Sequence, residues 1–169
     1  PTPRLKTNER LKYMQKITSF TVDHNNIVPG FYLSRVDGDV TTYDLRTRRP
    51  NCGDYMDLST MHTCEHMLAT YLRNGELKQD ILYFGPMGCQ TGFYLLVRNA
   101  DPERTMKALK TALSQVTAHT GEVFGNSQVE CGNFRTLSLK AAQDECARYL
   151  KSLENWTVDK LAYPKGDTK

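Results

Sequence analysis

The sequence DILYFGPMGCQTGFYLLVR, residues 80–98, has two short apolar segments on either side of a turn-rich centre. Residues 80–84 and 91–98 have the aromatic and branched aliphatic composition of β-strands, and the connection between them contains glycines and a proline. The pattern therefore predicts two strands joined by a short connection, within an antiparallel sheet.

The sequence upstream predicts a second hairpin. Residues 31–35 and 40–46 are rich in β-branched and aromatic side chains, with a turn signal at Asp37 and Gly38. Residues 17–22 form a further strand-like run. Residues 1–16 are polar and basic, and we expect them to be an extension, with or without a short helix, before a single domain spanning residues 17–169.

Three helices are predicted around these strands from caps, stops and apolar stripes. They span residues 60–74 after a Ser59 cap, residues 102–119 after an Asp101 cap, and residues 138–153. Hairpins combined with helices predict an α+β fold, in which the three helices pack on one face of the antiparallel sheet.

The composition excludes several classes of protein. No run reaches the ~18 apolar residues of a membrane span, and we expect no membrane partner. The net charge is only +3, and the densest basic cluster, Arg46, Arg48 and Arg49, fits a solvated or small-anion-binding role better than nucleic-acid binding. Five cysteines, an odd number, without a secretory signal predict reduced thiols in a cytoplasmic protein.

The segment HTCEH, residues 62–66, is the sharpest local pattern. On a helix, His62, Glu65 and His66 share one face, so the imidazoles can bind a single metal ion and the carboxylate can act as an acid or base beside it. Cys64 points away from that face and is expected to be buried. The alternative is two histidines on an ordinary helix face.

A catalytic ion needs a third protein ligand and an open position. Cys131, beside Gly132 in a loop, is a candidate, although spacing alone does not decide it. A structural ion in a non-enzymatic metal-binding module would instead take a fourth protein ligand, for instance His24 or Cys89. The HxxEH pattern also occurs in inverzincin zinc metallopeptidases, where the glutamate activates water.

Two other sites are less specific in the sequence. Cys89 lies among small residues between the two strands, where an accessible thiolate near a cation can carry protons, but a plain turn cysteine fits equally well. His119 is expected to be solvated or to complement the dipole at the end of the second helix.

Together these segments are similar to the S-ribosylhomocysteine lyase (LuxS) family over about residues 17–155. The motifs are SFTVDH (19–24), YDLR (43–46), PN (50–51), HTCEH (62–66), PMGCQTG (86–92) and ECG (130–132). The sequence departs from the family just after His24, and at Tyr83, where many members carry an acidic residue three positions before the proline.

The resemblance implies a LuxS/processing-peptidase-like metalloenzyme fold and a homodimer with active sites at its interface. It implies one iron(II) ion per subunit, replaceable by zinc or cobalt, held by His62, His66 and Cys131. Cys89 and Glu65 would be the acid/base pair, and the substrate contacts would be Ser19, His24 and Arg46. The implied reaction converts S-ribosyl-L-homocysteine to L-homocysteine and 4,5-dihydroxypentane-2,3-dione, the autoinducer-2 precursor.

The implied reaction explains why such groups are needed. The thioether sulfur is on the fifth carbon of the sugar, and the aldehyde is on the first. The carbonyl must move to the third carbon before the sulfur can be eliminated, and each shift passes through an enediolate. Each shift also takes a proton from one carbon and returns it to another, which suits a Lewis-acidic metal with two proton carriers.

Overall fold

The computed structural model describes residues 14–165, so most of the expected extension, residues 1–16, lies outside the described part. The sheet within this part has the strands β1 Gly30–Asp37, β2 Val40–Arg46, β3 Ile81–Pro86 and β4 Gly92–Arg98. They are ordered β1-β2-β4-β3, and every neighbouring pair is antiparallel. Both predicted hairpins are confirmed, and they join through β2 and β4.

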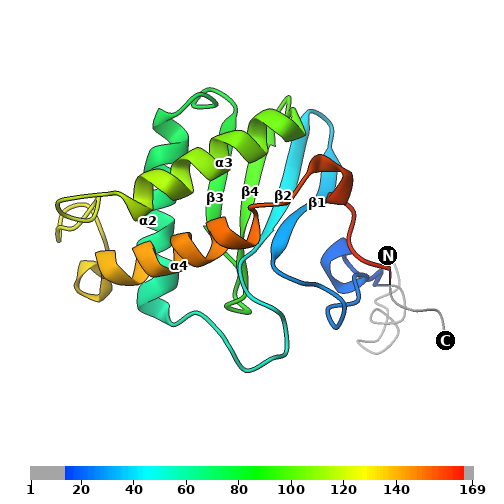
Figure 1. The fold of residues 1–169 in the computed structure, drawn as a ribbon, viewed down its shortest axis with the longest axis horizontal. Helices are drawn as coiled ribbons and strands as arrows, with labels where there is room; N and C mark the ends of the chain where they lie inside the picture. Colours follow the sequence, from blue (N-terminus) through cyan, green and yellow to red (C-terminus); the bar gives the residue numbers. More distant parts are fainter. Residues whose placement is uncertain (1–13, 166–169) are drawn as a thin grey trace, which may run out of the picture.

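The predicted helices pack on one face of this sheet, which confirms the α+β fold (Figure 1). They are α2 Leu58–Asn74, α3 Pro102–Thr117 and α4 Leu139–Ser152. Asp101 caps α3 as predicted, but the predicted Ser59 cap is wrong, because Asp57 accepts from the Thr60 amide at 2.6 Å and begins α2 earlier. None of the helices in the described residues is long and apolar enough to cross a membrane.

Successive side chains along each strand point to opposite faces of the sheet, and only one of these faces is covered by the helices. In β4, Phe93 and Leu95 are buried and belong to the hydrophobic core under the helices. Tyr94 and Leu96 lie between them in sequence and therefore project from the opposite face, which these helices leave uncovered. Core packing thus fixes the direction of every side chain on the uncovered face.

The predicted strand at residues 17–22 is wrong. The Phe20 amide donates to Ile17 O at 2.9 Å and closes a short 3-10 helix, η1 Thr18–Phe20. The Asp23 side chain then accepts from the Asn25 amide at 3.0 Å. Local side-chain-to-backbone hydrogen bonds of this kind favour turns over an extended strand.

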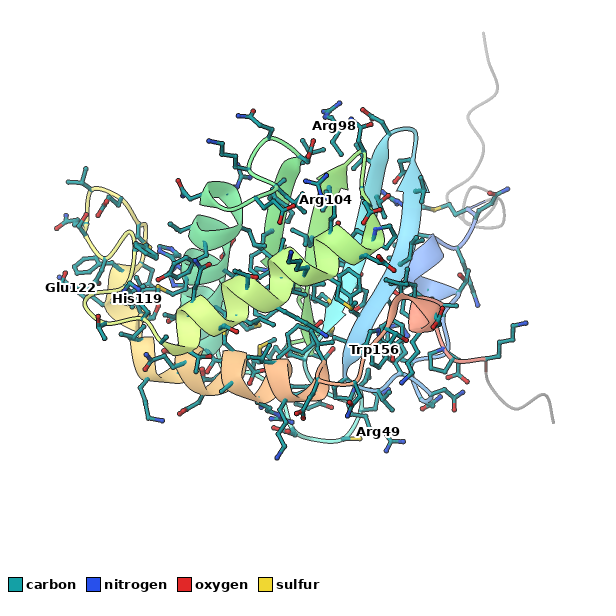
Figure 2. All side chains as sticks on the ribbon, turned by 45° about the horizontal axis from the view of Figure 1, so that its top comes forward. Arg49, Arg98, Arg104, His119, Glu122 and Trp156 are labelled. Carbon is teal, nitrogen blue, oxygen red and sulfur yellow. The ribbon has the colours of Figure 1, made fainter. Side chains whose placement is uncertain are left out.

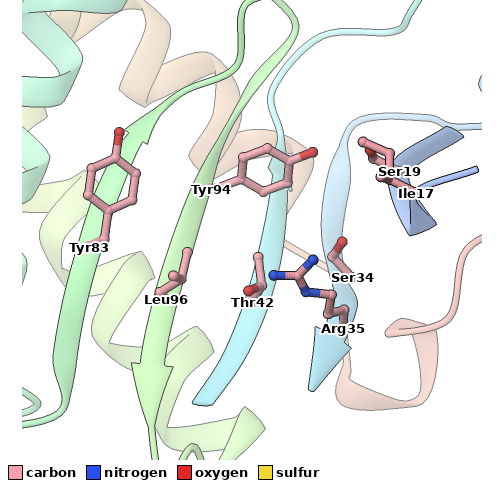
Figure 3. A pocket seen from close by; sticks show the side chains of 8 residues that line it. All are labelled: Ile17, Ser19, Ser34, Arg35, Thr42, Tyr83, Tyr94 and Leu96. Carbon is pink, nitrogen blue, oxygen red and sulfur yellow. The ribbon is translucent and has the colours of Figure 1, made fainter. Parts of the chain in front are cut away.

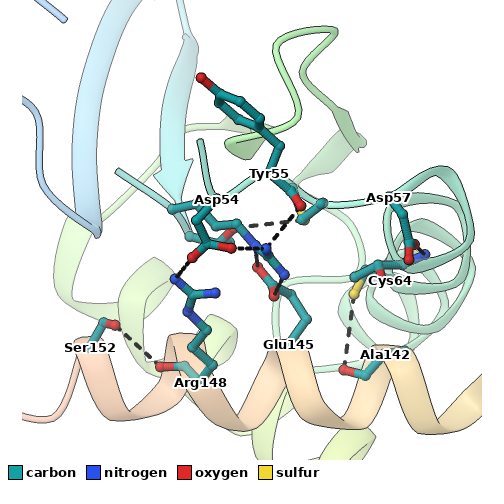
Figure 4. Close-up of polar contacts among 12 residues, drawn as sticks. Asp54, Tyr55, Asp57, Cys64, Ala142, Glu145, Arg148 and Ser152 are labelled. Carbon is teal, nitrogen blue, oxygen red and sulfur yellow. Dashed lines mark hydrogen bonds and ion pairs between the residues drawn. The ribbon is translucent and has the colours of Figure 1, made fainter. Parts of the chain in front are cut away.

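Two members of the basic cluster, Arg46 and Arg48, are not solvated as expected, whereas Arg49 is exposed. Arg46 is 2% exposed, and Arg48 makes a two-pronged contact with the buried Glu145 of α4, at 3.2 and 2.7 Å. Asp54 bridges Arg48 to Arg148 of α4, each at 2.5 Å (Figure 4). These ion pairs attach the β2–α2 connection to α4 and so fix where α2 begins.

Candidate metal centre and thiol site

Helix α2 presents two imidazoles on the side that faces away from the core. Cys64, as expected, is fully buried, and its Sγ lies 4.0 Å from the Ala142 carbonyl of α4 (Figure 4). His62 and His66, two residues away on either side, are partly exposed, with ring centroids 4.7 Å apart. The helix therefore directs both histidines toward the segment that follows α3.

Cys131 comes from that segment and completes a possible metal site. One ligand atom from each of His62, His66 and Cys131 lies within 4.8 Å of the others, and Cys131 Sγ lies 3.4 Å from His62 Nε2. The Cys131 amide donates to Ser127 O at 3.0 Å, so a local turn holds the cysteine in place. The predicted ligand set is thus brought together, across about 70 residues of chain.

Hydrogen bonds orient both imidazoles toward this meeting point. His66 Nδ1 lies 2.7 Å from the Phe124 carbonyl, which can only accept, so Nδ1 carries the proton and Nε2 keeps its lone pair. The Thr136 hydroxyl donates to Asn133 O at 3.1 Å and therefore accepts from His62 Nδ1 at 3.0 Å. Both Nε2 atoms are thereby prepared to bind a metal ion.

The electrostatics favour a neutral, ligating imidazole at His62. Burial, followed by the charge of the neighbouring His66, lowers the pKa of His62 below its ordinary value, while Glu65 acts in the opposite direction. Glu65 thus lies close enough to His62 for their charges to interact, on the helix face where it was predicted. Two nitrogens and a sulfur fit a borderline-soft divalent cation such as iron(II), zinc or cobalt.

Gly125 explains how the loop reaches His66. Its φ is +69°, and a Cβ there would lie 2.9 Å from His66 Nδ1, so a side chain would be both strained and obstructed. Sequence reasoning missed Gly125, and it missed Thr136 and the Phe124 carbonyl. The available signal was a glycine six residues before the cysteine ligand, which is weak without knowledge of the loop's path.

His119, expected to be solvated or to complement the dipole of the second helix, is half-buried and hydrogen-bonded through both ring nitrogens. The Tyr71 hydroxyl lies 2.7 Å from His119 Nδ1, and His119 Nε2 lies 2.9 Å from the Glu122 carbonyl. Phe124 packs edge-on against both rings. His119 therefore fastens the loop whose Phe124 carbonyl orients His66, near the left end of the molecule in Figure 2.

Cys89 belongs to a different site, at the β3–β4 turn. Its thiol is exposed, lies 3.1 Å from Thr91 Oγ1, and lies 3.8 Å from Arg46 Nη1. Arg46 also donates to Thr91 Oγ1 at 2.6 Å. The predicted cation near Cys89 is thus present.

Asp44 holds this arginine in position. Arg46 Nε donates to Asp44 Oδ1 at 3.1 Å and Nη2 donates to Oδ2 at 2.5 Å, and both residues are at most 2% exposed. Tyr163, near the C-terminal end of the described chain, donates to Asp44 Oδ2 at 2.8 Å. Sequence reasoning missed Asp44 and Tyr163.

Ser19 lies beside a cavity of about 370 Å³ on the uncovered face of the sheet (Figure 3). The cavity is lined by Ile17, Ser19, Ser34, Arg35, Thr42, Tyr83, Tyr94 and Leu96. Tyr83, the departure from the family pattern, is 48% exposed there. His24 lies in the turn after η1, with Nδ1 2.9 Å from Val22 O.

One chain keeps the thiol site and the metal-binding cluster on different parts of the molecule. Figure 1 shows α2 between the sheet and the segment at residues 120–137, which carries Cys131. Among the described residues, the metal-binding cluster does not contain Cys89.

Comparison with known proteins decides the family. The family model for S-ribosylhomocysteinase (LuxS) matches residues 17–160. The chain belongs to this LuxS family. It is 43% identical over 158 residues to the S-ribosylhomocysteine lyase of Desulfotalea psychrophila, a match that covers 89% of this chain and 99% of the relative.

Other relatives extend the match to distant bacteria. The S-ribosylhomocysteine lyase of Borreliella afzelii is 40% identical over 157 residues, covering 89% of this chain and all of the relative. That of Finegoldia magna is 39% identical over 157 residues, covering 90% of this chain and all of the relative. The likeness therefore spans the whole LuxS domain and not a single motif.

Proposed function

We propose that this LuxS-family protein is an S-ribosylhomocysteine lyase, which cleaves S-ribosyl-L-homocysteine to L-homocysteine and 4,5-dihydroxypentane-2,3-dione. The observation that carries the proposal is the convergence of His62, His66 and Cys131 in a chain that matches the family over residues 17–160. Three protein ligands leave a coordination position for substrate, as catalytic sites require. A thiolate as third ligand also differs from the carboxylate usual in inverzincin peptidases.

The metal in this proposal is one iron(II) per subunit, with zinc or cobalt as substitutes. The bound ion would supply a Lewis acid that polarises the sugar oxygens while the carbonyl migrates. Thr136 and the Phe124 carbonyl hold the two imidazoles in the tautomer that can ligate. Glu65 lies on the same helix face and would move protons beside the ion.

Cys89 would be the second proton carrier. Arg46, fixed by the buried Asp44, lies on one side of its sulfur and stabilises the anionic form that accepts a proton from a sugar carbon. Once protonated, the thiol can return that proton to the neighbouring carbon. Repetition of this exchange with Glu65 on the other side would carry the carbonyl to the position needed for elimination of the sulfur.

The proposal includes a homodimer, since Glu65 and Cys89 must reach one substrate. In a single chain the metal-binding cluster is formed by α2 and the segment at residues 120–137, whereas Cys89 belongs to the β3–β4 turn at the end of the sheet (Figure 1). The uncovered sheet face offers the exposed Tyr83, opposite Leu96, for burial against a second copy. Pairing of two such faces would bring the thiol site of one subunit to the metal of the other.

Ser19, His24 and Arg46 are proposed to contact the substrate. Ser19 lines the cavity on the uncovered face, and Arg46 contacts Cys89 at the end of the same face. Tyr83 would offer a phenol where many relatives have a carboxylate. The protein is further proposed to act in the cytoplasm, which agrees with its five free cysteines.

The test is homocysteine release from S-ribosylhomocysteine by the iron-loaded protein, with metal content measured on the same sample. We expect turnover that rises with iron occupancy and that stops after chelation. Protein that contains one iron per chain and releases no thiol would refute the proposal. Cleavage of an unstructured peptide by that protein would favour the peptidase instead.

A further inference from the structure

A segment after α4, residues 156–163, lies along strand β1 and forms a strap. The Trp156 indole donates to Phe31 O at 3.0 Å, and the residue is labelled beside β1 in Figure 2. Further along, the Leu33 amide donates to Leu161 O at 2.9 Å. Two hydrogen bonds to the β1 backbone therefore attach the strap to the sheet.

Tyr163 ends the strap and reaches the thiol site. Its ring stacks on Tyr32, with centroids 5.0 Å apart and planes at 19°, and its hydroxyl donates to Asp44 Oδ2 at 2.8 Å. Burial, reinforced by the negative charge of Asp44, raises the pKa of Tyr163, so the hydroxyl keeps its proton and remains a donor. The strap thus supplies Asp44 with a second partner besides Arg46.

We propose that Tyr163 is a positioning residue for the Cys89 thiolate, acting through Asp44 and Arg46. The inference rests on the proposed function, in which Cys89 carries protons. The described contacts form one continuous path from the Tyr163 hydroxyl through Asp44 and Arg46 to the Cys89 sulfur, and its links measure 2.8, 2.5 and 3.8 Å.

The direction of the effect follows from the charges. Asp44 is 1% exposed, so water does little to shield its carboxylate, and the Tyr163 hydroxyl stabilises part of its charge. Without that hydroxyl, the carboxylate opposes a negative charge on Cys89 more strongly and draws Arg46 toward itself. The thiolate is then less favoured, and Cys89 becomes less reactive.

The experiment compares alkylation of the full-length protein with Tyr163→Phe, which keeps the stacked ring and removes only the hydroxyl. Iodoacetamide labelling is followed by peptide mass spectrometry, and the exposed Cys52 serves as the internal reference. Loss of a hydrogen bond to a charged group changes an equilibrium constant by roughly tenfold or more. Because the effect on Cys89 is indirect, through Asp44 and Arg46, we expect a smaller change: the Cys89/Cys52 alkylation rate ratio at pH 7 should fall about three- to fivefold.

Further readouts separate positioning from general damage. The pH at half-maximal Cys89 alkylation should move upward in Tyr163→Phe. In turnover assays, kcat should fall while KM changes little. The matched control is Tyr32→Phe, which removes the hydroxyl of the stacking partner, bonded to Val28 O at 2.9 Å, and should leave the ratio unchanged. An unchanged melting temperature in both variants would show that the fold is intact.

An unchanged Cys89/Cys52 ratio in Tyr163→Phe would overturn the inference, as would an equal fall in Tyr32→Phe. The proposed function fails separately, if the iron-loaded wild-type protein releases no homocysteine. In that case a lowered ratio in Tyr163→Phe would still support the effect of Tyr163 on the Cys89 thiol, because the alkylation assay contains no substrate.

Discussion

The metal-binding cluster and the thiol site are built in opposite ways. His62 and His66 are partly exposed on one helix turn, and the loop that completes the cluster is positioned by the Phe124 carbonyl and the small Gly125. Cys89 is held at the end of the sheet beside Arg46, which is buried and charge-paired. The first site depends on a loop fitting against a helix, whereas the second depends on a buried ion pair.

This difference indicates how the two sites should respond to mutation. A ligand cluster at the surface can lose its ion while the fold survives, because the core under α2 does not include the ligands. A buried ion pair within the sheet cannot lose one member without a large cost in folding free energy. Variants of the metal-binding cluster should therefore lose metal and keep their stability, whereas variants of the buried ion pair should lose stability.

The largest expected effect is on metal content. Cys131→Ala should abolish stable metal binding, because two imidazoles alone are left, whereas Cys89→Ala should retain the metal and lose turnover by about 10²–10⁴-fold. Elemental analysis of the purified variants, together with the thiol-release assay, measures both quantities. Loss of metal in Cys89→Ala would place that sulfur on the ion and erase the distinction between the regions.

The second-largest expected effect is the loss of turnover in Glu65→Gln. The amide keeps the shape of the side chain but cannot carry a proton, so turnover should fall about 10²–10⁴-fold while most of the metal remains. Burial and the charge of His66 still lower the pKa of His62 in this variant, so the His62 imidazole stays available to the ion. Near-normal turnover would remove Glu65 from the mechanism.

Most of the fold could be predicted because its signals are local. The turn residues between the strands and the Asp101 cap of α3 act within a few residues of chain, and the structure confirms them. The strand predicted at residues 17–22 failed because its apolar residues carry no information about a partner strand. The Ser59 cap failed because Asp57, two residues earlier, offers a stronger acceptor at the same helix end.

The residues of the candidate site also fall into those predictable from a local pattern and those that depend on distant contacts. His62 and His66 were predictable from helix spacing, whereas Cys131 and Cys89 gained their roles only through the family resemblance. Asp44 was missed although residues two apart on a strand share a face; what the sequence does not show is that this charged pair is buried. Contacts across many residues, such as Tyr163 with Asp44, depend on the path of the strap.

Asp44→Ala tests the buried ion pair of the second region. Removal of the carboxylate leaves the buried Arg46 without its counter-charge, and unfolding free energy should fall by about 3–5 kcal/mol. Asp39→Ala is the matched control, since the exposed Asp39–Arg98 pair contributes about 0–1 kcal/mol. Urea denaturation measures both, and equal losses would contradict the contrast.

The smallest expected effect is on the metal affinity of the metal-binding cluster. Thr136→Val keeps the side-chain shape but removes the hydroxyl that accepts from His62 Nδ1 at 3.0 Å. The imidazole can then rotate or change tautomer, so metal should dissociate about 10–100-fold more readily. Competition with a chromophoric chelator measures the dissociation constant.

The control for that variant is Thr111→Val on the exposed side of α3, which should leave the dissociation constant unchanged. Alkylation of Cys89 should also be unchanged in Thr136→Val, because no described contact links this threonine to the sheet end. A parallel loss of Cys89 reactivity would show that the two regions are coupled, either across the proposed dimer interface or within one chain through the β2–α2 connection that the Arg48–Glu145 pair attaches to α4.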